Sequence, residues 1–147
     1  MALNLTFRSI HHGSVDYALT VALRDRVLRH PLGLYFTPEQ LEAESDEFHL
    51  SAWDDNQLLA CLVLKPVDAF TVKMRQVAVQ ENLQGQGIGK KLVAYAETFA
   101  REHLFKNMVL HARESAIAFY LVQGYELFGE PFTEVSIPHR AMRKNLD

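Results

Sequence analysis

Three glycines alternate with other residues in the stretch QGQGIGKK, residues 84–91, which ends in two lysines. Because glycine has no side chain, such a loop can present several backbone N–H groups to one anion. An amphipathic helix is expected directly after the loop, and the positive end of its dipole favours a phosphate there. Lys90 and Lys91 would oppose that dipole unless an anion is bound. The stretch therefore indicates a phosphate or pyrophosphate site; the open alternative is a glycine-rich helix start with solvated lysines.

Two common phosphate-binding loops do not match this stretch. A P-loop requires G-x-x-x-x-G-K followed by a hydroxyl residue that holds magnesium, whereas Lys91 follows Gly89-Lys90 and residue 84 is glutamine. The dinucleotide fingerprint G-x-G-x-x-G follows the first strand of a βαβ unit, whereas this loop reads G-x-G-x-G and follows three or four expected strands. The pattern that remains is Q-x-x-G-x-G, matched by Gln84, Gly87 and Gly89 at a strand-to-helix junction.

The elements that must position this loop follow from hydrophobic periodicity and from capping residues. Their order is βααβββαβαββ, which predicts an α/β (α+β) domain over residues 1–147, with a mixed, mostly antiparallel central sheet and helices on both faces. Strands are expected at about 3–10, 48–55, 58–67, 71–79, 107–112, 125–129 and 138–146, and helices at about 14–29, 38–44, 87–103 and 114–123.

Composition limits the classes of function. The chain has 147 residues, 48% hydrophobic and 22% charged, with a net charge of −3, so we expect one globular domain and no nucleic-acid partner. No apolar run approaches a membrane span and no signal peptide is expected, which favours a cytoplasmic protein without a membrane partner. The single cysteine, Cys61, is expected in the core, and the seven histidines show no metal-ligand spacing, so no metal is expected.

Four ordered pieces of the chain resemble the GCN5-related N-acetyltransferase (GNAT) superfamily. They are MRQVAV (74–79), QGQGIG (84–89), KKLVAYAETFAREH (90–103) and LHARESAIAFYLVQGYELFG (110–129). The tail FTEVSIPHRAMRKNL, together with RDRVLR and ESDEFH in the N-terminal half, is similar to the ElaA/YjcF-like branch.

The resemblance implies acetyl-CoA as donor and a primary amine, on a small molecule or a peptide, as acceptor. It implies that the strand bearing Val77, Ala78 and Val79 diverges from its neighbour and hydrogen-bonds the pantetheine arm through its backbone. It places the pyrophosphate on the loop of Gln84, Gly85, Gln86, Gly87, Ile88, Gly89 and Lys90, and further coenzyme contacts at Arg113, Ala116, Phe119 and Tyr120. Val77, Val79 and Phe119 are also expected to pack in the core, and Arg113 stands where many relatives carry asparagine.

Tyr120 lies where the family places a tyrosine near the coenzyme sulfur, so the resemblance implies that it protonates the leaving thiolate. The general base is less defined, because KMRQVAV lacks the carboxylate that many relatives carry there. His111, at the end of a buried strand, is the first candidate, since histidine titrates in the useful range. Asp46, His49, Glu134 or a water relay are alternatives, and His139 is expected to be a surface or structural residue.

Other readings stay open. The domain could bind CoA as a sensor or interaction module without turnover, or transfer acetyl to a hydroxyl, or transfer a longer acyl group. The acceptor site is expected from the first helices and the loop 30–36, in a monomer or a homodimer. The acidic residues there could attract a cationic amine or form a solvated helix face: Glu42, Glu44, Asp46 and Glu47.

Overall fold

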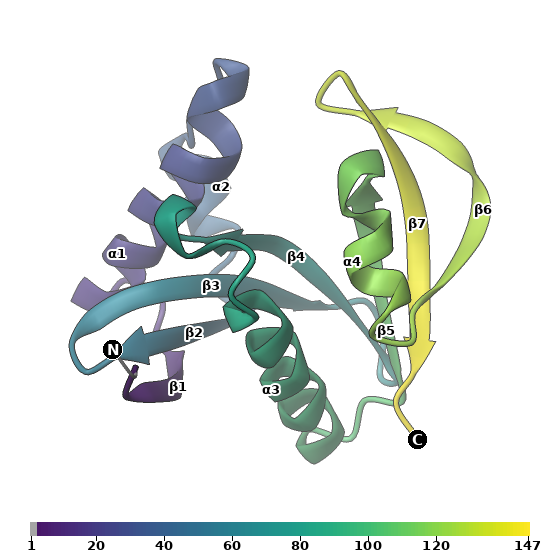
Figure 1. Ribbon diagram of the computed structural model, residues 1–147, viewed down its shortest axis with the longest axis horizontal. Coiled ribbons are helices and arrows are strands. Elements are labelled where there is room, and N and C mark those ends of the chain that lie inside the picture. Colours follow the sequence, from purple (N-terminus) through teal and green to yellow (C-terminus); the bar gives the residue numbers. More distant parts are fainter. Residues whose placement is uncertain (1–2) are drawn as a thin grey trace.

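A single seven-stranded sheet forms the centre of the computed structural model, which describes residues 3–147. The strand order is β1-β2-β3-β4-β5-β7-β6, and every neighbouring pair is antiparallel except β4–β5, which is parallel (Figure 1). The element order and the mixed sheet confirm the fold class expected from the sequence. The strands are β1 (Leu5–Ile10), β2 (Phe48–Asp54), β3 (Gln57–Pro66), β4 (Thr71–Val79), β5 (Asn107–Arg113), β6 (Glu126–Glu134) and β7 (Ile137–Asn145).

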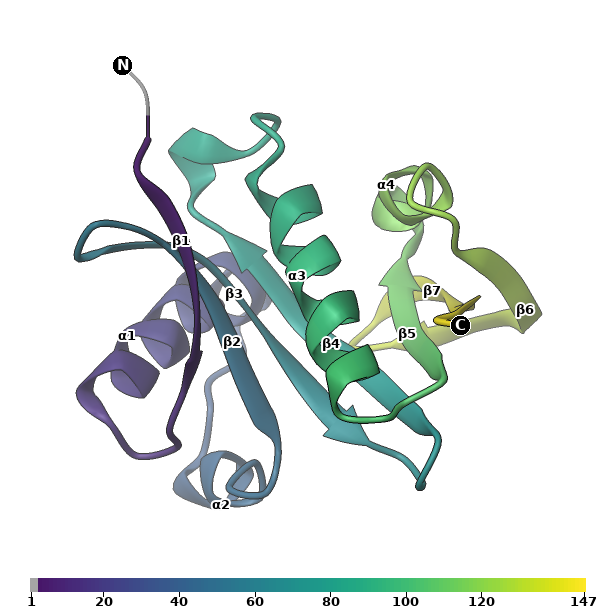
Figure 2. The same ribbon diagram turned by 90° about the horizontal axis from the view of Figure 1, so that it is seen from below.

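Helices cover both faces of the sheet. Helices α1 (Val15–Arg24) and α2 (Pro38–Glu42) lie on one face and α3 (Ile88–Glu102) on the other (Figure 2). The short helix α4 (Ile117–Leu121) contributes to the same large core as α3. The expected caps are present, since Ser14 accepts a hydrogen bond from the Tyr17 amide and Thr37 forms a capping box with Gln40. None of the helices in the described chain is long and apolar enough to cross a membrane.

Two elements differ from the sequence expectation. The first helix ends at Arg24 and continues as a π-helical turn over Asp25–Arg29 and a 3₁₀ turn over His30–Leu32, instead of one α-helix to residue 29. Strand β6 extends to Glu134, well past the expected end at residue 129, and its register with β7 shifts between Phe128 and Phe132. Such a bulge interrupts the alternation by which a strand is recognised. Cys61 is buried in the core as expected, and burial raises the pKa of its thiol to about 12.

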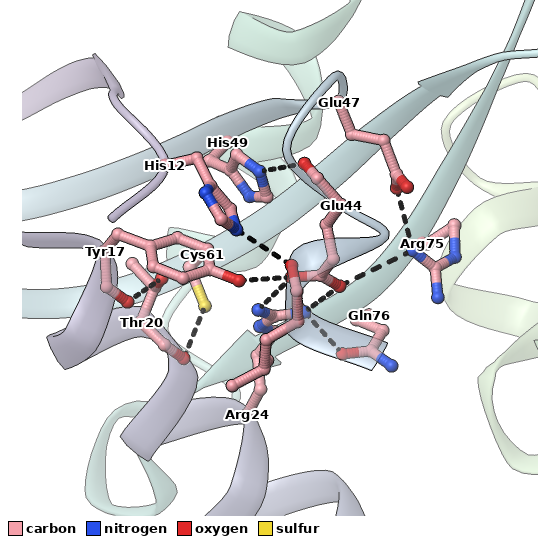
Figure 3. A network of polar contacts seen from close by, with 11 residues as sticks. His12, Tyr17, Thr20, Arg24, Glu44, Glu47, His49, Cys61, Arg75 and Gln76 are labelled. Atoms are coloured by element: carbon pink, nitrogen blue, oxygen red, sulfur yellow. Dashed lines mark hydrogen bonds and ion pairs between the residues drawn. The ribbon is translucent and has the colours of Figure 1, made fainter. Parts of the chain in front are cut away.

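A buried ion pair joins the N-terminal helices to β4 (Figure 3). The Glu44 carboxylate accepts hydrogen bonds from the Arg24 guanidinium at 2.7 and 2.9 Å and from the Tyr17 hydroxyl at 2.7 Å. Arg24 also donates to Oε1 of Gln76, on β4, at 2.8 Å. Burial alone would raise the pKa of Glu44, but the hydrogen bonds and charge of Arg24, with the Tyr17 bond, hold it below its usual value. The pair therefore fixes the position of α1 relative to the middle of β4.

We expect Arg24→Met to lower the free energy of unfolding by about 3–5 kcal/mol at neutral pH, because it leaves Glu44 buried without its partner. The matched variant Arg26→Met removes a solvent-exposed pair with Glu81 and should cost less than about 1 kcal/mol. Urea unfolding of both variants provides the measurement.

The pH dependence of the difference in unfolding free energy between wild type and Arg24→Met is a second readout. Because the folded-state pKa of Glu44 is depressed, the stabilisation from the pair is present at neutral pH and is lost as pH falls through that folded pKa. The stability gap between wild type and Arg24→Met should therefore narrow in acid. A gap equal to that of Arg26→Met, or one that is constant with pH, would contradict the role given to the pair.

Candidate active site

The sheet opens between β4 and β5. The two strands are paired at only four positions, from Thr71 opposite Asn107 to Met74 opposite Leu110. Beyond Met74, β4 stays with β3 while β5 stays with β7, so the two strands separate (Figures 1 and 2). The separation coincides with a bulge in β4, where Gln76 has a φ of +53° and the register with β3 shifts. The backbone edge of β4 beyond this bulge therefore has no neighbouring strand on the β5 side.

A cavity of about 260 Å³ lies where the strands separate. Of the residues singled out from the sequence, it is lined by Val77, His111, Arg113, Ala116, Tyr120, Glu134 and His139. Gln76 and Val135 also line it and were not expected from the sequence, whereas Leu28 and Arg29 come from the first helix, where the acceptor site was expected without individual residues. The repeated basic residues of RDRVLR are the signal that could have drawn attention to Arg29, but nothing in the sequence marks the bulge at Gln76.

Tyr120 closes one side of this cavity from α4. Its side chain is buried, and its ring contacts Phe119 and Tyr125 edge-on. Within residues 3–147 its hydroxyl has no hydrogen-bond partner, and burial raises its pKa to about 12. Tyr120 therefore presents a phenol that stays protonated at neutral pH and has its proton available for a group in the cavity.

His111 lies on the β5 side of the cavity, held by a carboxylate. Its Nδ1 atom is 3.0 Å from Oε1 of Glu134 and 3.2 Å from Nζ of Lys73. Oε2 of Glu134 is 3.8 Å from Nε2 of His139. Burial would raise the pKa of Glu134, but the hydrogen bond and charge of His111, with the charges of His139 and Lys73, hold it below its usual value. The Glu134 carboxylate beside Nδ1 orients the imidazole ring at the cavity.

The other base candidates lie outside the cavity. His49 is buried and its Nε2 atom is 3.0 Å from the carbonyl oxygen of Glu44, while Asp46 is exposed on the turn before β2. Neither residue lines the cavity. The geometry thus brings Glu134 and His139 together with His111 and leaves Asp46 and His49 apart from them.

The glycine loop follows β4 after a 3₁₀ turn over Glu81–Leu83 and leads into α3. Gly85 and Gly87 each have a φ of +83°, a conformation that side chains rarely adopt. Among the described residues, no protein group accepts a hydrogen bond from the backbone amides of residues 84–90, four of which precede α3 and three of which form its first turn. The loop therefore presents unpaired N–H groups at a helix N-terminus, as an anion site requires.

Gly89 has a different reason for being glycine. A Cβ atom at this position would approach Cγ2 of Val79 to 3.2 Å and Cζ of Phe119 to 3.4 Å. Gly89 therefore lets α3 pack closely on β4 and α4, and Phe119 supports the loop from the core side. Val79, Ala78 and Phe119 do not line the cavity, whereas Val77 does.

Comparisons with known proteins identify relatives of the chain. YjcF of Bacillus subtilis (strain 168), described as an uncharacterized N-acetyltransferase, is 25% identical over 108 residues, which are 73% of this chain and 75% of YjcF. The crystal structure of an acyl-CoA N-acyltransferase from Pseudomonas aeruginosa is similar to this one, with a TM-score of 0.80 over 96% of this chain and 99% of that chain. The two sequences are 29% identical.

Two more distant structures share the fold. ElaA from Escherichia coli is 23% identical, with a TM-score of 0.80 over 96% of this chain and 99% of ElaA. A GNAT family acetyltransferase from Elizabethkingia anophelis, solved with acetyl-CoA bound, is 20% identical, with a TM-score of 0.75 over 97% and 98% of the two chains. The model of the acetyltransferase (GNAT) family matches residues 17–125. The resemblance seen in the sequence is confirmed, and the chain belongs to the acetyltransferase (GNAT) family.

Proposed function

We propose that this protein binds acetyl-CoA and transfers the acetyl group directly to a primary amine. The observation that carries the proposal is a two-part site along the free edge of β4. One part is the loop with unpaired amides at the start of α3, and the other is the cavity with the protonated phenol of Tyr120. In acetyl-CoA the pantetheine arm joins an anionic pyrophosphate to the thioester, which fits these two parts in that order.

The amides of Gln84, Gly85, Gln86, Gly87, Ile88, Gly89 and Lys90 would hold the pyrophosphate, with the positive end of α3 behind them. The backbone of Val77, Ala78 and Val79 would hydrogen-bond the pantetheine arm in place of the missing neighbouring strand. Lys90 is exposed at the helix start, where it can meet a phosphate. Arg113 donates to the Leu28 carbonyl at 3.2 Å, so we assign it, with Ala116, to the wall of the cavity beside the thioester.

The reaction would need two proton transfers, one to the leaving thiolate and one from the attacking amine. The neutral amine attacks the thioester carbon, a C–N bond forms, and the C–S bond breaks. The Tyr120 hydroxyl gives its proton to the departing thiolate, so CoA leaves as a thiol. His111, oriented by Glu134, takes the proton of the attacking amine directly or through water. Return of this proton to Tyr120 through solvent completes the cycle.

A non-catalytic CoA sensor of the same fold is the second candidate, since β4 carries no carboxylate base. Release of free CoA from acetyl-CoA with a panel of amines separates the two functions. Amine-dependent release supports the enzyme, and binding of acetyl-CoA without any release supports the sensor.

Replacing Gly87 tests the loop. Valine at a φ of +83° is strained, so Gly87→Val should displace the amides and raise the CoA dissociation constant at least ~10-fold in calorimetric titration. Gly13→Val is a matched control, because Gly13 has a φ of +81° and an equally open surrounding but precedes α1. Both variants should lose similar thermal stability, and only Gly87→Val should lose CoA affinity. Equal CoA affinity in the two variants would refute the pyrophosphate assignment.

Tyr120→Phe keeps the ring and removes only the hydroxyl. We expect kcat to fall ~10- to 10³-fold, in the range of a lost general acid or electrostatic donor. CoA affinity should change by less than ~1 kcal/mol, about one hydrogen bond. Tyr95→Phe, on α3 with its ring stacked on Phe7, is the control and should retain wild-type kcat. Full turnover by Tyr120→Phe would make Tyr120 a packing residue only.

His111→Asn removes the proposed base. We expect kcat to fall ~10²-fold or more with CoA affinity nearly unchanged. His11→Asn, on the exposed turn before α1, controls for the substitution itself. A His111→Asn enzyme with near-normal kcat would assign the proton transfer to water or to another group.

A further inference from the structure

A second cavity, of about 630 Å³, lies on the α2 side of β4. It shares Arg29 and Gln76 with the first cavity, so the two meet at the bulge where the strands separate. If the acetyl thioester lies in the first cavity, the second is the side from which an acceptor reaches it. Figure 3 shows Gln76, Arg75, Glu44 and Glu47 gathered along this side of β4.

The charges that line the second cavity do not balance. Its cationic residues are Arg29, Lys65, Lys73 and Arg75, and its carboxylates are Glu44 and Glu47. Both carboxylates already have partners, because Glu44 is bound by Arg24 and Glu47 lies 2.8 Å from Arg75. Glu44 and Glu47 are therefore not free to attract a cationic amine, and the unbalanced charge is positive.

Two of these cations are cross-strand neighbours on adjacent strands. Lys65 on β3 is directly opposite Lys73 on β4 in the antiparallel register. Like charges in this arrangement destabilise a sheet. Burial lowers the pKa of Lys73, and the charges of Arg75 and Lys65 lower it further against the opposing effect of Glu134. A bound anion would relieve this repulsion.

Two donors at the cavity also lack acceptors. Within residues 3–147, the Lys65 ammonium has no hydrogen-bond or ion-pair partner, and the buried Nε atom of Arg29 has none either. The Arg29 guanidinium is 4.6 Å from the Phe36 ring centroid and donates to the Tyr35 carbonyl, which holds it at the cavity wall. The Lys65 ammonium and the free Nε–H of Arg29 are two cationic donors, which can each give a hydrogen bond to a carboxylate.

We propose that the acceptor is a small amine that carries a carboxylate, of the size and type of an amino acid. Lys65 and Arg29 bind the carboxylate in the second cavity, and the amine is directed past Gln76 toward the thioester. This inference rests on the proposed acetyl transfer and adds the class of acceptor. Lys65 acts in binding only, since it does not line the first cavity.

The test compares amino acids with their own carboxamides, which keep the amine and the side chain but lose the negative charge. With acetyl-CoA as donor and CoA release as readout, kcat/KM should be at least ~10-fold higher for the carboxylate member of reactive pairs, the scale of one charged hydrogen bond. Lys65→Gln should raise KM for the carboxylates ~10-fold, leave kcat nearly unchanged, and leave the carboxamides unaffected.

Lys106→Gln is the matched control, because Lys106 pairs with Asp147 and lines neither of the two cavities. It should change no kinetic constant. Lys65→Gln should also be at least as stable to heat as wild type, since it removes one of two opposed charges, so a folding defect would not be the cause of its kinetic effect.

A binding measurement separates this inference from the proposed function. N-acetyl amino acids and their carboxamides are titrated into the complex of the protein with CoA, for wild type and Lys65→Gln. A carboxylate preference that Lys65→Gln abolishes supports the acceptor class, even if no amine is turned over and the proposed acetyl transfer fails. Carboxamides that bind or react as well as carboxylates overturn the acceptor class, while their acetylation would leave the proposed transfer intact.

Discussion

The separation of β4 from β5 after the Met74–Leu110 pair is the constraint on which the candidate site depends. A sheet stabilises its backbone by pairing N–H and C=O groups, so an unpaired strand edge inside a fold is costly unless another group pairs with it. Here the free edge begins at the bulge around Gln76, and Arg24, which is paired with Glu44, donates a hydrogen bond to the Gln76 side chain. The N-terminal helices therefore stabilise the opening in the sheet as well as covering it.

The opening is lined by groups that favour anions and by one neutral acid. The unpaired amides at the start of α3 favour an anion, and the unbalanced cations Lys65 and Arg29 line the second cavity. Between them lies a neutral phenol, Tyr120, whose raised pKa keeps its proton at physiological pH. If both proposed anions bind, the loop and the second cavity would hold the two substrates with their reactive ends at the first cavity.

The parts of the site that depend on local sequence could be predicted, and those that depend on tertiary contacts could not. The glycine loop, the caps and the element order follow from short-range patterns, and the structure has them where they were expected. The bulge at Gln76 has no sequence signature, because Gln76 is not a glycine and its positive φ and register shift are visible only in the folded sheet. Glu44 has the sequence context of a solvated acid and is instead buried by Arg24, twenty residues away in the chain. The opposition of Lys65 and Lys73 requires the strand register, which only the folded chain supplies.

A crystal structure of the protein with acetyl-CoA bound is the most direct test of the proposed site. We predict the pyrophosphate on the amides of residues 84–90, the pantetheine arm along β4 beyond Met74, and the thioester sulfur within hydrogen-bond distance of the Tyr120 hydroxyl. A pyrophosphate held elsewhere, or a thioester outside the opening between β4 and β5, would contradict it.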